Sequence, residues 1–164
     1  MIKIFWKNVL RFVFLVLLQG LLLIKVPGTP YLYILFILLL PFETPGWLLI
    51  VLGFSLGISI DIFYNTYGLH AATTVFAAYL RPVILSSIAP RDGYDQGSLP
   101  KMSEFGFWWF LKYSLLIVVI HHTMLSFLHE FSFSGFINNW LDLIISIVFT
   151  VFLIILSQLF SFKK

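Results

Sequence analysis

The stretch DIFYNTYGLHAATT, from Asp61 to Thr74, is a short polar island between two long apolar runs. The chain around it is 60% hydrophobic and only 10% charged. Because lipid makes ionisable groups costly, an acid and a histidine placed there, Asp61 and His70, are candidates for a functional site. The rest of the sequence indicates where this island lies.

The composition predicts a polytopic membrane protein. The 164 residues include 19 Phe, 7 Tyr and 5 Trp, and the mean hydropathy is +1.02. This is more apolar surface than a water-exposed domain of that size accommodates. Without cysteine the chain has no disulfide, thiolate metal site or cysteine nucleophile. A dispersed net charge of +3 gives no argument for nucleic-acid binding. The basic, apolar N-terminus is followed by no small-residue cleavage site, so we expect it to be retained as a first span.

Six segments are candidates for crossing the bilayer, which takes roughly 20 mostly apolar residues. Five come close to this length, and the sixth is shorter and bounded by prolines; they are 9–26, 47–64, 69–89, 107–128 and 136–160, with 30–42 as the short one. Basic residues gather at both chain ends, at Lys3, Lys7, Arg11, Lys163 and Lys164. The positive-inside rule then places both termini in the cytoplasm, which requires an even number of crossings. We predict an all-α integral membrane protein, a single domain over 1–164 built as a six-helix bundle, with a cytoplasmic loop at 90–106.

The polar island predicts a tight turn between two spans. Asn65 and Gly68 suit such a turn, and His70 opens the next span. Asp61 then lies close to His70 or to the free backbone amides at the start of that span, where a carboxylate is stabilised by capping. We favour this structural interpretation over a ligand or partner contact at the outer mouth.

Small residues in the span before the turn admit two interpretations. Gly53, Ser55 and Gly57 spell GxSxG, but a hydrolase nucleophile elbow needs a strand–turn–helix context that a membrane helix does not offer. The same residues spell GxxxG, which lets helices approach closely. We therefore predict a helix-packing face formed by Gly53, Gly57, Ala71 and Ala78.

Arg81 lies well inside an apolar run. An arginine at depth either extends to the headgroups or pairs with an acid, and we favour the first. Glu43 is the acid on the correct side for a pair. Pro82 disfavours helical geometry at Arg81 and predicts a kink.

Histidines follow in the fifth apolar segment. Adjacent side chains point in different directions on a helix, so His121 and His122 do not suit joint metal ligation. We expect one of them to face the interior and bond a partner such as Asp142. His129 precedes a glutamate, but the HExxH motif also needs a histidine at position 133, which is Phe.

The residues between Pro41 and Pro82 carry a family resemblance. Asp61 at the end of a Gly-rich span, an aromatic turn, Gly68-Leu69-His70-Ala71-Ala72 and Arg81-Pro82 resemble the rod shape-determining protein MreD family. The upstream stretch PFETPGWLLIVLGFSLGISIDIFYNT fits the same pattern, as do the chain length and the six-span estimate.

This resemblance implies a non-enzymatic subunit of the cell-elongation machinery in the bacterial inner membrane. Its fold would be similar to the substrate-binding subunits of energy-coupling-factor vitamin transporters. Its partners would be an MreC-like single-span protein, membrane lipid and, in the wider assembly, an MreB-like filament and a RodA-type glycosyltransferase with its transpeptidase. The family brings no cofactor, metal or catalytic residue. Asp61, Asn65, His70 and Arg81 then become a partner or structural cluster, and we expect a partner helix to dock along the Gly53–Gly57 or Ala71–Ala78 face.

Two other function classes stay open. The chain could be the substrate-binding subunit of a small-molecule importer, with Asp61, Asn65, His70 and His121 in an outward cavity. An intramembrane hydrolase is disfavoured because neither motif is complete, so Ser55→Ala is expected to leave function intact.

Overall fold

Helices α3 (Gly46–Tyr64) and α4 (Leu69–Ser87) form an antiparallel hairpin of two 19-residue helices. The computed structural model describes residues 2–26, 28–95, 97–131 and 137–161, with backbone alone at 2–5. Described residues form helices, turns and bends but no strand. α4 packs in turn on α6 (Phe107–Glu130), and α6 packs on α8 (Trp140–Ser161). The predicted start of the last span, residue 136, lies outside the described residues.

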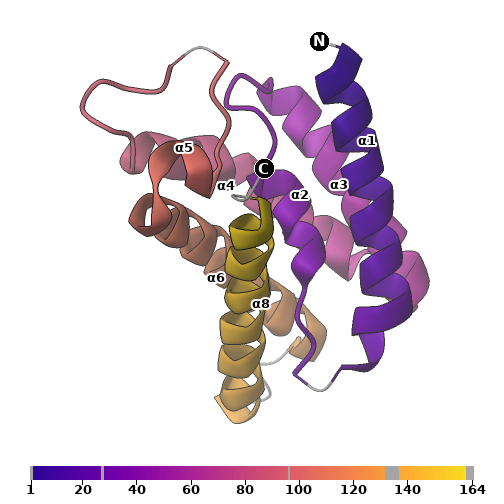
Figure 1. Ribbon diagram of the computed structural model, residues 1–164. Coiled ribbons are helices and arrows are strands. Elements are labelled where there is room, and N and C mark those ends of the chain that lie inside the picture. Colours follow the sequence, from indigo (N-terminus) through magenta and orange to yellow (C-terminus); the bar gives the residue numbers. More distant parts are fainter. Residues whose placement is uncertain (1, 27, 96, 132–136, 162–164) are drawn as a thin grey trace.

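The first helical segment packs along α3. α1 (Ile2–Leu17) continues through a π-helical turn (Leu18–Leu22) and a 3-10 turn (Leu23–Lys25). A short helix, α5 (Met102–Phe105), lies in the long loop before α6. The start of α1, the end of α8 and this loop lie toward the same, upper side of the molecule in Figure 1. We call this side, with residues 41–45 and 88–106, the loop end; the opposite side, with residues 26–30 and 65–68, is the turn end.

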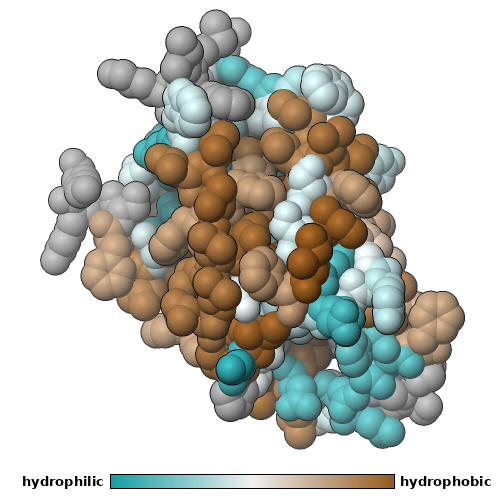
Figure 2. Space-filling view, turned by 90° about the vertical axis from the view of Figure 1, so that its right-hand side faces the viewer, coloured by the Kyte–Doolittle hydropathy of each residue, from teal (hydrophilic) through white to brown (hydrophobic). Residues whose placement is uncertain are grey.

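Four helices of the described residues are long and apolar enough to cross a membrane. They are Trp6–Lys25, Gly46–Tyr64, Phe107–Glu130 and Trp140–Phe160. Large apolar side chains on them face outward, including Phe14 at 63%, Phe54 at 54% and Phe152 at 58% exposure. Figure 2 shows such residues covering the middle of one face, with hydrophilic residues gathered toward its lower end. Such a surface is typical of an integral membrane protein.

The short segment 30–42 is buried inside the bundle and is mostly not a regular α-helix. A 3-10 turn (Leu32–Ile34) leads into α2 (Leu35–Leu38), and the residues on either side are non-helical. The expectation of a spanning helix over 30–42 is therefore wrong for this segment. Seven helical residues cover only about 12 Å, but the non-helical ends carry the chain from the turn end to the loop end.

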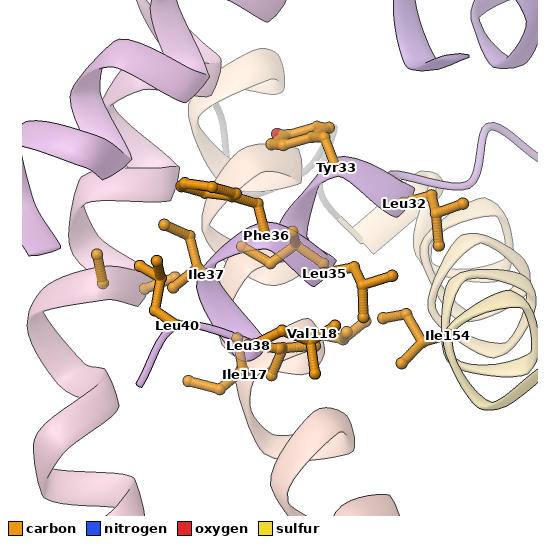
Figure 3. Packing of buried hydrophobic residues seen from close by; sticks show 14 of the residues in the cluster. Leu32, Tyr33, Leu35, Phe36, Ile37, Leu38, Leu40, Ile117, Val118 and Ile154 are labelled. Atoms are coloured by element: carbon orange, nitrogen blue, oxygen red, sulfur yellow. The ribbon is translucent and has the colours of Figure 1, made fainter. Parts of the chain in front are cut away.

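The central position of this segment follows from its side chains, which are apolar in every direction. Tyr33, Ile34, Ile37 and Leu38 are all 0% exposed. Figure 3 shows Leu32 and Leu35 directed toward Ile154 of α8, whereas Leu38 lies beside Ile117 of α6 and Ile37 points to the opposite side. A run with no polar face can only be surrounded by other elements. It fills the core of the bundle.

The kink predicted at Pro82 does not interrupt α4. The helix runs through Pro82 and continues to Ser87. Ile84 and Leu85 beyond the proline are both buried in the hydrophobic cluster. Packing of this last turn offsets the backbone hydrogen bond that proline cannot donate.

Candidate functional site

Asp61 caps the start of α4, as the sequence predicted. Its Oδ1 accepts the backbone N–H of His70 at 3.0 Å and its Oδ2 accepts that of Ala71 at 2.9 Å. The Thr66 hydroxyl donates to the same carboxylate at 2.5 Å. The acid is 3% exposed and binds the backbone of His70, not its ring. It thus satisfies amides that the first turn of a helix leaves unpaired.

The backbone of the turn explains why the hairpin closes at this place. Asn65 ends α3 in the left-handed conformation at φ 56°, and Gly68 precedes α4 at φ 91°. Asparagine and glycine are the residues that adopt this conformation most readily. The Asn65 side chain is exposed, so the structure does not bring it into the cluster predicted with Asp61.

Close helix packing at the glycines is confirmed, but it occurs within the chain. A Cβ added to Gly57 would lie 2.4 Å from Ala71 Cα and 2.5 Å from the His70 carbonyl oxygen. At Gly53 a Cβ would lie 3.1 Å from the Ala78 Cβ. The predicted docking of a partner helix on the Gly53–Gly57 or Ala71–Ala78 face is therefore wrong, because α3 and α4 already use these faces for each other.

Arg81 is wholly buried near the loop end, so both expectations for it are wrong. It does not reach the headgroups: its exposed fraction is 0%, and its guanidinium donates to the Leu40 carbonyl and, at 3.5 Å, to that of Pro41. Its Nε donates to the Tyr113 hydroxyl at 2.8 Å. It does not pair with Glu43 either, because that acid accepts the Gly97 N–H at 2.9 Å in the loop. The non-helical end of the 30–42 segment is what requires the arginine, since its carbonyls have no helical partner.

Other polar side chains serve the same segment and were missed by sequence reasoning. Gln19 bonds both the Pro30 carbonyl, at 3.0 Å, and the Leu32 N–H, at 2.9 Å. Thr150 accepts the Tyr31 N–H at 3.0 Å, and Tyr113 donates to the Leu38 carbonyl at 3.1 Å. Arg11 donates to the Leu39 carbonyl at 3.2 Å. The sequence does contain a signal for such contacts, because a short apolar segment between prolines must leave unpaired backbone groups at its ends. Polar side chains in the neighbouring apolar helices are the candidates to bond these groups.

Three of the four histidines, His70, His121 and His122, form a buried network beside Tyr33. The Tyr33 hydroxyl lies 2.8 Å from His70 Nδ1 and 2.8 Å from His121 Nε2. His122 Nε2 lies 2.9 Å from the Thr150 hydroxyl. His121 and His122 are thus both buried and hydrogen-bonded, whereas the sequence predicted that one of them faces the interior. The partner of His121 is Tyr33, and the partner of His122 is Thr150. Asp142 is exposed, so its expected pairing with a histidine is wrong.

The two bonds of Tyr33 couple the protonation of two rings. A hydroxyl has one hydrogen, so it donates to only one of the two ring nitrogens and accepts from the other if that nitrogen carries a hydrogen. In the fully bonded arrangement, the tautomer of His70 therefore fixes the tautomer of His121. This coupling connects the turn end with the middle of the bundle.

The four residues predicted to form a partner or structural cluster lie in two places. Asp61 and His70 share the turn end, and Arg81 lies eleven residues further along α4, about 16 Å away. A cavity of about 540 Å³ opens beside the first pair. His70 lines it, but Asp61, Asn65 and His121 are not part of its lining. Of the four residues expected to line an importer's cavity, His70 alone lines this one.

The loop end is closed by an aromatic cluster. Phe42 stacks on Tyr94 at 4.2 Å between ring centroids, and Phe105 and Trp109 pack around this pair. The Tyr94 hydroxyl donates to the Leu85 carbonyl at 2.7 Å. Burial raises the pKa of this hydroxyl, which keeps it protonated and able to donate. The predicted loop 90–106 is therefore anchored to the bundle at Tyr94 and Phe105.

Within the described residues, no group of three or more His, Asp or Glu side chains is arranged to hold a metal ion. No buried side-chain nitrogen or oxygen of these residues lacks a hydrogen-bond partner. Neither a protein-family model, nor a curated protein, nor a solved structure matches this chain.

Proposed function

We propose that the chain is a non-enzymatic membrane scaffold of the MreD type, a regulatory subunit of bacterial cell elongation and peptidoglycan synthesis. The observation that carries this proposal is the use of the motif residues. Asp61 and Arg81 form hydrogen bonds with backbone groups of the chain itself. Gly57 allows the close contact between α3 and α4. Such residues make a rigid bundle, which is what a scaffold needs.

In the proposed topology the chain crosses the inner membrane six times, and both termini lie in the cytoplasm. Four crossings are the long apolar helices. α4 is the fifth, because it runs antiparallel to α3 over the same number of residues and several of its polar groups, such as Thr73 and Arg81, are buried. The segment 30–42 is the sixth, and its non-helical backbone is tolerated at depth because protein surrounds it.

A membrane partner would bind the outer faces of the bundle. The small-residue faces of α3 and α4 are occupied, whereas α1, α3 and α8 carry large exposed apolar side chains. An MreC-like single-span helix is the partner proposed for one of these faces. The folded loop at 90–106 would be available to an MreB-like filament or to a RodA-type enzyme with its transpeptidase.

The absence of cysteine gives a clean test of this proposal. Single cysteines at Phe14, Phe54 and Phe152, which are exposed on three helices, would be paired with cysteines along an MreC-like helix of the same genome. Buried Ile154 is the matched control. We expect a defined heteromeric mass by native mass spectrometry and disulfide crosslinks from one face. A lone subunit, with no crosslink from any exposed position, would overturn the scaffold proposal.

The cavity at the turn end favours a second candidate, the substrate-binding subunit of a small-molecule importer. It has the volume of a small-molecule site. Retention of a vitamin through purification, with no heteromeric complex, would favour this candidate over the scaffold.

A further inference from the structure

The cavity at the turn end is polar and acidic. Its wall is built from residues 28–31, the turn between α3 and α4, the last two turns of α6 and the first turns of α8. Glu130 and Asp142 both line it, and its described lining contains no lysine or arginine. An anionic ligand is therefore disfavoured there, and a positive charge is favoured.

Neither acid is fully compensated by the described residues. Glu130 Oε1 accepts the Asn139 side-chain N–H at 2.8 Å and lies 3.7 Å from His129 Nδ1. Asp142 has no ion pair or hydrogen bond to another described side chain. It lies in the first turn of α8 and is exposed at the mouth of the cavity. Among the described residues, the Asp142 carboxylate and Glu130 Oε2 therefore remain available to an incoming group.

The wall of the cavity includes three neighbouring rings, those of Tyr31, Tyr64 and His70. His70 is 2% exposed and its Nδ1 is bonded to Tyr33, but no described residue bonds its Nε2. His70 lines the cavity, and Nε2 is the ring nitrogen that the bond to Tyr33 leaves open to a ligand. Tyr31 packs beside it at 5.4 Å between centroids, and Tyr64 at 4.8 Å. Tyrosine rings stabilise cations, and their hydroxyls and His70 Nε2 bond polar groups.

We propose that this cavity binds an ammonium group carried by a small polar molecule. Asp142 and Glu130 supply the opposite charge, and Tyr31 and Tyr64 supply the aromatic wall. His70 Nε2 bonds a hydroxyl or amine of the same ligand. The ammonium group comes either from a free organic amine or from the headgroup of an amine-bearing lipid at the outer interface. This site goes beyond the scaffold role and does not depend on it.

Two pairs of probes test the proposal on the delipidated, full-length protein in detergent. Ethanolamine is compared with ethylene glycol, and phosphatidylethanolamine with phosphatidylglycerol, by native mass spectrometry and thermal shift. We expect at least one ammonium probe to bind about tenfold more tightly than its hydroxyl counterpart. Preference within the first pair identifies a free amine, and preference restricted to the second pair identifies a lipid headgroup. Equal binding within both pairs, or no binding of any probe, would overturn the site.

Conservative variants locate the binding. Asp142→Asn and Glu130→Gln keep the shape of the side chains. Each is expected to lower the affinity for the ammonium probe about three- to tenfold. Asp95→Asn, in the loop at the opposite end, is the matched control and should leave the affinity unchanged. Variants with an unchanged melting temperature and an unchanged affinity would show that the acids do not hold the ligand. Neither variant touches the outer faces used for the MreC-like crosslinks, so the two proposals can fail separately.

Discussion

At the loop end, the guanidinium of Arg81 and the rings around Phe42 and Tyr94 fill the interior, and the Arg81 guanidinium and the Tyr94 hydroxyl are both hydrogen-bonded. At the turn end, Asp61 is just as fully bonded, but the neighbouring cavity leaves His70 Nε2 and Asp142 facing outward. A buried polar group stabilises a fold when it is satisfied, and it is available to a ligand when it is not. The comparison predicts that substitutions at the loop end reduce stability more than function. Substitutions of residues that line the cavity are predicted to reduce ligand binding more than stability.

The largest effect is expected from Arg81→Met. The variant keeps an unbranched side chain but leaves the carbonyls of Leu40 and Pro41 without a donor in a water-free interior. Loss of charged hydrogen bonds of this kind costs about 3–5 kcal/mol. Reversible unfolding in SDS, followed by circular dichroism, measures it, with the exposed Arg91→Met as control. Equal loss in the two variants would contradict the buried role of Arg81.

Gly57→Leu is expected to cost about 3 kcal/mol. Its side chain would meet the backbone of Ala71 and His70, which cannot move without separating α3 from α4. Gly46→Leu is the matched control, because no atom lies within 4 Å of the Cβ position at Gly46. Thermal midpoints in detergent compare them. If Gly57→Leu retained the wild-type midpoint and lost only the partner, the helix face would belong to the partner after all.

Asp61→Ala tests the turn end, with an expected loss of about 2 kcal/mol. Two backbone amides of α4 and the Thr66 hydroxyl would lose their acceptor. Hydrogen exchange should report faster exchange at the His70 and Ala71 amides. The exposed Asp92→Ala provides the baseline. Unchanged protection of these amides would mean that another group caps the helix.

Tyr94→Phe is expected to have the smallest effect, about 1 kcal/mol. It removes one hydrogen bond to the Leu85 carbonyl and keeps the stacking on Phe42. Limited proteolysis of the loop 90–106 measures whether it loosens. Cleavage as rapid as in Phe42→Ala would show that the hydroxyl, not the ring stack, holds the loop.

Much of the turn end could be predicted from the sequence because its contacts are local. Asp61 and the amides it caps are nine and ten residues apart, and the turn residues between them fix the geometry. The role of Arg81 could not be predicted in this way. Its acceptors lie forty residues earlier in a segment that was expected to be a helix with satisfied carbonyls.

Some pairings also depend on the whole fold. Tyr31 and Thr150 are 119 residues apart, and the sequence pattern of neither one indicates the other. The same is true of Tyr33 and His121, which are separated by 88 residues. The expectation that Asp142 pairs with a histidine rests on its predicted depth, and depth alone does not specify which way a side chain points.

The sequence by itself determined the membrane class, the positions of the long apolar helices and the polar turn between α3 and α4. These follow from hydropathy and local backbone preference, which are properties of short stretches of chain. Only the tertiary structure decided that the segment 30–42 is a buried, broken helix, that Arg81 and Gln19 serve its backbone, and that a cavity opens beside His70. Unpaired backbone groups in a lipid-surrounded core must find donors and acceptors, and packing decides which distant side chains can reach them.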